Sequence, residues 1–124
     1  MEYSLAHFGL YVKDPEVSKQ FYMDVLGFKL IYETDPDMET KLIFLQSNDC
    51  IIELIGNKGG DRIDGYFDHL CLKVDDIEKA VEDLKAKGVE IEGEIHTSRR
   101  VLGGTKNVFF RGPDGEHLEI HQFL

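Results

Sequence analysis

The sequence predicts an α+β fold built from two βαβββ modules, and two observations carry this prediction. First, the 124-residue chain repeats its pattern at half its length. When His7 is placed on His69, Asp14 falls on Asp76. Second, each half has one stretch of helical periodicity among short apolar segments typical of strands. We therefore expect a single domain over residues 1–124, with module one at 1–60 and module two at 66–124.

The first half begins with an expected strand over residues 5–12. A helix follows at Asp14-Pro15, because aspartate caps helices and proline suits their first turn. Gly27 is a natural stop just past this helix. The apolar stripe of the helix consists of Val17, Phe21 and Val25. Three further strands are expected over residues 28–33, 41–46 and 50–55.

The second half repeats this order. A strand over residues 69–74 precedes a helix that Asp76 caps and Gly88 ends. The helix stripe consists of Ile77, Val81 and Leu84. Strands follow over residues 89–95, 107–111 and 116–121, the last two joined by the turn signal Gly-Pro-Asp-Gly. One helix covers only one face of each sheet, so the other face must meet the second module or a partner subunit.

Composition excludes several classes of function. The formal net charge is −10 and the isoelectric point is about 4.8, with no basic stripe that would attract nucleic acid or an anionic membrane. No apolar run is long enough to span a bilayer, and the first residues lack the features of a signal peptide. Cys50 and Cys71 have no CxxC spacing. We expect a reduced, cytoplasmic protein.

Four residues in the doubled pattern suit a divalent metal: His7, Glu53, His69 and Glu119. Alternation along a strand places each histidine on the more polar face, with small Gly9 or Cys71 beside it. Glu53 is anomalous, because its own face carries isoleucines and a lone carboxylate there is costly unless it is paired or metal-bound.

Three neighbouring residues leave alternatives open. His117 and His121 share the face of Glu119 and are expected to be flanking polar residues, although either would also serve as a ligand. Cys71 is expected to be a small filler rather than a thiolate ligand. The metal hypothesis depends on four matched residues, since one strand histidine alone is usually structural.

The whole chain resembles the vicinal oxygen chelate superfamily. The matching segments are His-Phe-Gly-Leu-Tyr-Val, residues 21–28, His-Leu-Cys-Leu-Lys-Val, and Gly-Pro-Asp-Gly-Glu-His-Leu-Glu-Ile. This resemblance implies two βαβββ modules forming a curved mixed sheet around a metal-holding cleft. Within the superfamily, the His, Glu, His, Glu order is most similar to glyoxalase I of the short bacterial type, a lactoylglutathione lyase.

That resemblance implies an activity and its cofactor. The reaction converts the hemithioacetal of a 2-oxoaldehyde, such as that of methylglyoxal with glutathione, to the 2-hydroxyacyl thioester through an enediolate. Nickel or cobalt is the favoured metal, with zinc, manganese or iron possible. Glu119 is implied as the base that moves the proton, with Glu53 as the second candidate.

It also implies substrate contacts and an assembly. Asn57 matches a family position that contacts glutathione. Tyr11 stands where the family usually has an arginine for a glutathione carboxylate. Lys73, Arg99 and Arg100 are candidates to supply that charge instead, and a thiol other than glutathione is an alternative. The resemblance further implies a homodimer with shared sites, in which His7 and Glu53 of one chain join His69 and Glu119 of the other.

Other functions of the same superfamily stay open. An extradiol dioxygenase needs only two histidines and one carboxylate, and Glu53 would be a fourth ligand. An acyl-CoA epimerase would use the same proton chemistry, and a thiol transferase needs three protein ligands. A non-catalytic small-molecule binder is also an alternative, but such members generally lose the ligand residues that this chain keeps.

Overall fold

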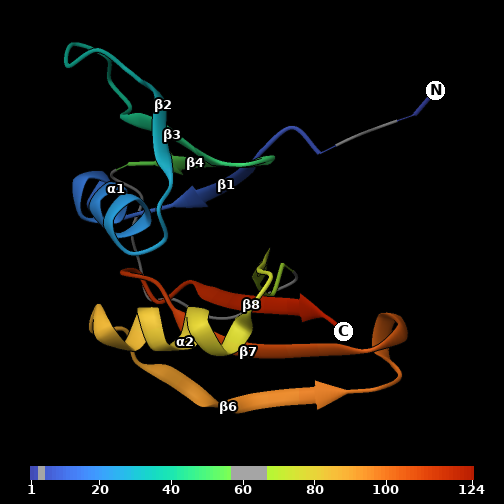
Figure 1. The fold of residues 1–124 in the computed structure, drawn as a ribbon. Helices are drawn as coiled ribbons and strands as arrows, with labels where there is room; N and C mark the ends of the chain where they lie inside the picture. The colour runs from blue at the N-terminus through green and yellow to red at the C-terminus, as the bar shows by residue number, and fades with distance from the viewer. Residues whose placement is uncertain (3–4, 57–66) are drawn as a thin grey trace. The chain divides into compact units, whose positions relative to one another are not determined.

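The computed structural model describes residues 1–2, 5–56 and 67–124. The chain divides into two compact units, Met1–Asp61 and Arg62–Leu124, and each is described by itself. The first unit contains β1 (Phe8–Tyr11), α1 (Pro15–Asp24), β2 (Lys29–Glu33), β3 (Leu42–Ser47) and β4 (Cys50–Ile55). The second contains β5 (Leu70–Lys73), α2 (Ile77–Ala86), β6 (Ile91–Ser98), the 3₁₀ helix η1 (Val101–Gly103), β7 (Thr105–Arg111) and β8 (His117–Phe123). The predicted α+β fold with two βαβββ modules is confirmed (Figure 1).

Each unit has its own mixed four-stranded sheet. The strand orders are β1-β4-β3-β2 and β5-β8-β7-β6. The first and last strands of each unit are parallel, and the other neighbours are antiparallel. The parallel register places Gly9 opposite Glu53, and Cys71 opposite Glu119. Residues far apart in the sequence therefore become neighbours on the same face of a sheet.

The core of the first unit lies between α1 and its sheet. The helix packs against β3 and β4, whose inward side chains are fully buried. These side chains are Ile43, Leu45, Ile52 and Leu54. The predicted helix stripe is wrong at Val17, which is 51% exposed, whereas Ser18 and Tyr22 are buried. The large Tyr22 ring packs edge-on against Phe28. The buried residues Ser18 and Tyr22 each lie one position after a member of the predicted stripe, so the buried face of the helix differs from the expected one by one residue.

The core of the second unit follows the prediction more closely. Ile77, Val81 and Leu84 are all buried on α2, which packs against β6 and β8 and lies along one face of its sheet (Figure 1). The sheet contributes Val108, Phe110, Leu118 and Ile120 to this core. The predicted stripe is confirmed here because its three members span an unbroken apolar face.

Both helices begin and end as the sequence predicts. The Asp14 carboxylate accepts hydrogen bonds from the backbone N–H groups of Glu16 and Val17, and Asp76 accepts one from Lys79. Gly27 and Gly88 follow the helices with φ of 75° and 83°. A side chain at either glycine would be strained at this φ.

The sixth strand is longer than expected. It continues to Ser98 rather than ending at residue 95, with a register shift between Glu92 and His96. Gly93 within this shift has a φ of 72°, which interrupts the alternation that sequence reasoning uses. Ser98 Oγ then accepts hydrogen bonds from the N–H groups of Arg100 and Val101, and this starts η1.

In the part of the chain that the structure describes, neither helix has the length and apolar character needed to cross a bilayer.

We expect Leu54→Ala to lower the free energy of unfolding by about 2–5 kcal/mol, because it leaves a cavity at a fully buried position. Leu30→Ala is the matched control, since Leu30 is 39% exposed on the outer strand β2 and its loss should cost under about 1 kcal/mol. Urea unfolding followed by circular dichroism measures both. Equal losses would contradict this assignment of the core.

Candidate metal centre

The first unit brings His7 and Glu53 together. His7 lies just before β1, and Glu53 lies in the middle of β4, its parallel neighbour. His7 Nε2 is 3.4 Å from Glu53 Oε1. The Glu53 side chain is 17% exposed, and the Phe44 ring meets the imidazole edge-on with centroids 5.5 Å apart. An imidazole nitrogen and a carboxylate oxygen thus lie side by side in apolar surroundings.

The second unit repeats this arrangement with His69 and Glu119. His69 lies just before β5, Glu119 lies on β8, and His69 Nε2 is 3.6 Å from Glu119 Oε1. The Phe109 ring meets His69 edge-on with centroids 5.3 Å apart. The two pairs therefore agree in separation, in strand pairing and in the aromatic ring beside the imidazole.

These separations fit the ligands of a shared ion better than they fit a hydrogen bond. A good hydrogen bond between nitrogen and oxygen spans about 2.7–3.2 Å. Two ligands each about 2.1 Å from one ion lie about 3–3.5 Å apart, depending on the coordination angle. The 3.4 Å separation falls in that range, and the 3.6 Å separation lies just above it. Imidazole and carboxylate donors suit nickel, cobalt, zinc and manganese, so the residues present fit a divalent metal.

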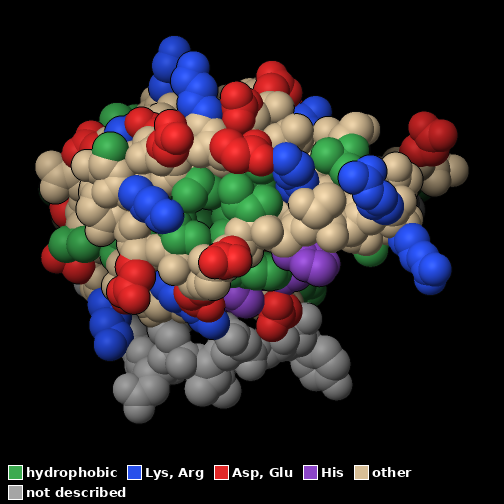
Figure 2. Space-filling model, turned by 60° about the horizontal axis from the view of Figure 1, so that its bottom comes forward, with side chains coloured by type: hydrophobic (Ala, Val, Ile, Leu, Met, Phe, Trp, Pro, Cys, Tyr) green, Lys and Arg blue, Asp and Glu red, His purple; other side chains and the backbone are tan. Residues whose placement is uncertain are grey.

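Asp68 orients His69 in a way that sequence reasoning missed. Asp68 Oδ2 lies 2.8 Å from His69 Nδ1. A carboxylate only accepts here, so Nδ1 carries the proton and Nε2 keeps its lone pair for a metal. In the space-filling view, histidine side chains reach the surface beside acidic ones (Figure 2). The signal was available in the sequence, because Asp68 directly precedes His69, whereas Ala6 precedes His7.

Asn107 and Cys71 contact the second carboxylate. Asn107 Nδ2 donates to Glu119 Oε2 over 2.9 Å, which leaves Oε1 facing His69. Burial, followed by a hydrogen bond to Glu119 and the charge of that carboxylate, raises the pKa of the Cys71 thiol to about 12. Glu119 is buried, so these contacts restrict its carboxylate. Sequence reasoning treated Cys71 as a filler and gave Asn107 no role.

The two half-sites differ in what flanks them. The strand registers pair Leu42 with Ile55, and Asn107 with His121, at equivalent places in the two sheets. Polar residues of the second unit stand where the first has apolar or small ones. The polar residues of the second unit are Asp68, Cys71, Asn107, His117 and His121. Their equivalents in the first unit are, in the same order, Ala6, Gly9, Leu42, Ile51 and Ile55. The second carboxylate therefore lies among hydrogen-bonding and ligating groups, and the first lies among hydrocarbon.

The remaining predicted site residues are less constrained. Tyr11 is 59% exposed at the end of β1, and Lys73 is exposed at the equivalent place on β5. Arg99 and Arg100 are exposed and directly follow β6. Asn57 lies outside the described residues.

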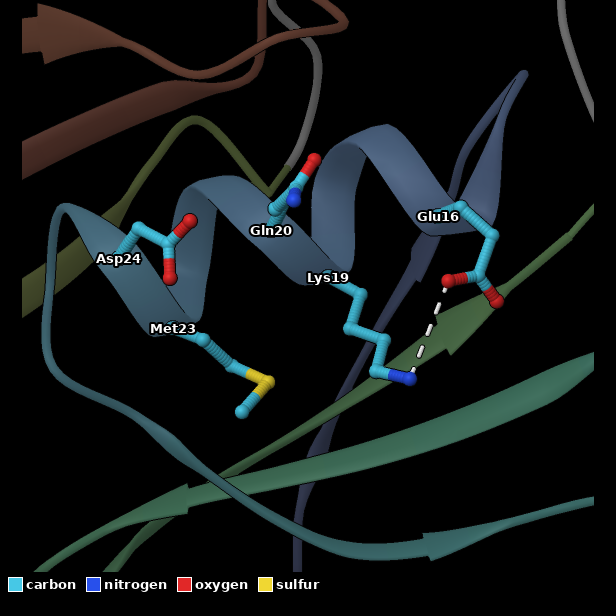
Figure 3. A pocket seen from close by; sticks show the side chains of 5 residues that line it. All are labelled: Glu16, Lys19, Gln20, Met23 and Asp24. Carbon is cyan, nitrogen blue, oxygen red and sulfur yellow. Dashed lines mark ion pairs between the residues drawn. The ribbon is translucent and has the colours of Figure 1, made fainter.

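A hollow of about 290 Å³ on α1 lies elsewhere in the first unit (Figure 3). Its lining comes from one helix, and Lys19 within it lies 3.8 Å from Glu16. The helix covers the sheet face opposite His7 and Glu53, so this hollow is separate from the paired ligands. The lining residues are Glu16, Lys19, Gln20, Met23 and Asp24.

Comparisons with known proteins agree with this geometry. The family profile described as the Glyoxalase/Bleomycin resistance protein/Dioxygenase superfamily matches residues 4–120. A probable lactoylglutathione lyase of Synechocystis is 34% identical, over 95% of this chain and 94% of that protein. The lactoylglutathione lyase of Escherichia coli is 32% identical, over 94% and 90%.

A solved structure extends the comparison of the fold. A mutant fosfomycin resistance protein of Listeria monocytogenes, complexed with Mn(II) and a dihydroxypropylphosphonic acid, has a TM-score of 0.77. Its sequence is 22% identical, and the match covers all of this chain and 93% of that one. At this identity the likeness shows the fold alone.

We expect Glu119→Gln to lower the pKa of the Cys71 thiol in metal-free protein, because it removes a charge that opposes the thiolate. At a fixed alkaline pH, more thiolate forms and iodoacetamide alkylates Cys71 faster. The rate is measured by mass spectrometry in a Cys50→Ser background. Glu78→Gln is the control, since Glu78 pairs with Lys106 instead. An unchanged Glu119→Gln rate would contradict the influence of this carboxylate on the thiol.

Proposed function

Since the chain belongs to the Glyoxalase/Bleomycin resistance protein/Dioxygenase superfamily, we propose that it is a metal-dependent lyase of the glyoxalase I type. Its substrate would be the hemithioacetal of a 2-oxoaldehyde and a thiol, with methylglyoxal and glutathione as the first candidates. Its product would be the 2-hydroxyacyl thioester. The names of the relatives from Synechocystis and Escherichia coli support this reaction.

The repeated histidine–glutamate pair is the observation that carries the proposal. Each unit supplies one imidazole nitrogen and one carboxylate oxygen, 3.4 or 3.6 Å apart. Two such pairs make a set of four protein ligands that would hold a divalent ion, and that ion would polarise the neighbouring oxygens of a substrate. A pure binding module has no need of four matched ligands, so this set favours an enzyme.

A bound divalent ion would act as a Lewis acid and stabilise negative charge on the substrate oxygens. Glu119 would remove the proton from the carbon that bears sulfur and return it to the neighbouring carbon. Asn107 donates a hydrogen bond to Oε2 of Glu119, so Oε1 would be the oxygen that carries this proton. The reaction is an isomerisation and needs no other reactant, because the proton taken from one carbon returns to its neighbour and the hydroxyl proton passes from one oxygen to the other.

Glu53 would serve as the second carboxylate ligand and as the base for the opposite substrate face. It lies among apolar side chains, and a Cβ built at Gly9 would lie only 3.5 Å from its Oε1. Apolar surroundings strengthen the interaction of this carboxylate with a bound ion. His7 and His69 would complete the set as neutral ligands through Nε2.

The thiol portion of the substrate needs a cation for its carboxylates. Lys73 and the pair Arg99 and Arg100 are exposed and would supply this charge in place of the arginine that Tyr11 replaces. Asn57 would add a polar contact. This assignment takes the positive charge that binds the thiol portion from the second unit and one polar contact from the first.

We place the complete site in a homodimer, with His7 and Glu53 of one chain joining His69 and Glu119 of the other. The ligand-bearing sheet faces support this arrangement, because the helix of each unit covers only the opposite face. Sedimentation of catalytically active protein as a monomer would contradict it.

We expect chelator-stripped protein to regain turnover of methylglyoxal with glutathione when it is reloaded with nickel or cobalt. Lactoylglutathione formation, followed by ultraviolet absorbance, measures the recovery, and unloaded protein is the control. Metal binding without turnover for nickel, cobalt, zinc and iron alike would reject glutathione as the thiol and leave the metal centre intact.

Glu119→Gln should lower kcat by about 10²–10⁴-fold, because the amide cannot accept the proton. Glu90→Gln is a matched control on an exposed residue and should keep kcat unchanged. Circular dichroism checks that both variants fold. A Glu119→Gln enzyme with undiminished kcat would move the role of base to Glu53.

A further inference from the structure

The second unit carries a group of three potential metal ligands beyond the histidine–glutamate pair. Cys71 lies on β5, and Glu119 and His121 lie two residues apart on β8. Parallel pairing places Cys71 opposite Glu119, and alternation places His121 on the same face as Glu119. One ligand atom from each lies within 4.8 Å of the other two. We call these three residues the thiol triad.

His121 gives the first reason to assign this triad a ligand. Among the described residues, its Nε2 is buried and has no hydrogen-bond partner. A buried polar nitrogen without a partner is costly, and native structures rarely leave one unsatisfied. Its ring packs against Phe123, with centroids 4.8 Å apart. A metal ion that accepts the lone pair of Nε2 would satisfy this atom.

Cys71 gives the second reason. Its Sγ lies on the ligand-bearing face of the sheet, opposite Glu119 in the parallel register, and within 4.8 Å of the ligand atoms that Glu119 and His121 offer. A divalent cation held there would stabilise both the thiolate and the carboxylate through its positive charge. Binding would form a metal–Sγ bond and release the thiol proton to water.

We propose that Cys71, Glu119 and His121 form a zinc-binding site within the second unit. One sulfur, one imidazole nitrogen and one carboxylate oxygen suit a thiophilic divalent ion in tetrahedral coordination. Three protein ligands leave the fourth position open for water or another small ligand. The site goes beyond the proposed lyase activity and needs no residue of the first unit.

The first unit provides an internal comparison. The residues equivalent to the thiol triad are Gly9, Glu53 and Ile55, so the first sheet keeps only the carboxylate. The two sites in the second unit share Glu119. Zinc held by the thiol triad therefore competes with the ion of the histidine–glutamate pairs for that carboxylate.

The test uses cobalt(II) as a spectroscopic substitute for zinc in the full chain with Cys50→Ser and His7→Ala. The first substitution leaves Cys71 as the one thiol, and the second removes a ligand of the other centre. We expect a thiolate-to-cobalt charge-transfer band in the near ultraviolet, which one equivalent of zinc abolishes. Absence of the band from folded, cobalt-bound protein would overturn the proposal.

Substitutions taken from the first unit sharpen this test. Cys71→Gly should abolish the band, and His121→Ile should weaken zinc binding by more than about 100-fold. Persistence of the band in folded Cys71→Gly protein would overturn the proposal. Cys71→Ser is a conservative variant that removes the band without a change in backbone freedom. None of these readouts requires turnover, so failure of the lyase activity leaves the result unaffected.

Transplanting the thiol triad into the first unit is the reciprocal test. A Cβ at Gly9 would meet Glu53 and Ile55 at ordinary contact distances of 3.5 and 3.6 Å, so cysteine fits there. Gly9→Cys with Ile55→His, in a Cys50→Ser and Cys71→Gly background, should restore the band. Folded transplant protein that lacks the band would contradict the proposal that a thiol, a carboxylate and an imidazole at these three strand positions bind the metal.

Discussion

Parallel pairing of the first and last strands in each unit is the constraint on which the rest depends. A histidine just before one strand reaches a glutamate in the middle of the other only because β1 lies beside β4 and β5 lies beside β8. The chain between them must cross over, and the helix of each unit makes that crossover and supplies the core beneath it. The apolar face below fixes the register, because a slip of one residue would turn Glu53 and Glu119 into the helix-facing core.

The sequence was most informative where its patterns repeat. The cap residues Asp14 and Asp76 and the α2 stripe are confirmed, because local chemistry determines them. The predicted α1 stripe is wrong at Val17, which is exposed, whereas Tyr22 is buried. Both residues suit a buried position, and only packing against the sheet determines which of them faces the core. Alternation predicted which face of its strand each histidine and glutamate occupies, but their closeness depends on the parallel pairing of the strands. The contacts of Asp68 and Asn107 depend on strand pairing, which no local pattern specifies.

Duplication has produced two chemically different environments on the same scaffold. Both units keep the imidazole, the carboxylate and the aromatic ring, and these depend on backbone positions that the fold fixes. The flanking positions have diverged: Leu42 and Ile55 surround one carboxylate with hydrocarbon, whereas Asn107 and His121 surround the other with polar atoms. The exchange of a few side chains at the same register positions changes the hydrogen-bonding surroundings of a carboxylate, while the strand order stays the same.

The raised pKa of Cys71 has a consequence for the reactivity of this thiol with oxidants. Peroxide attacks the thiolate, so the raised pKa lowers the fraction of this thiol that reacts at neutral pH. Sensor cysteines have the opposite property, because a low pKa makes them sensitive to oxidants. Cys71 in metal-free protein should therefore form sulfenic acid more slowly than a cysteine whose thiol has the ordinary pKa.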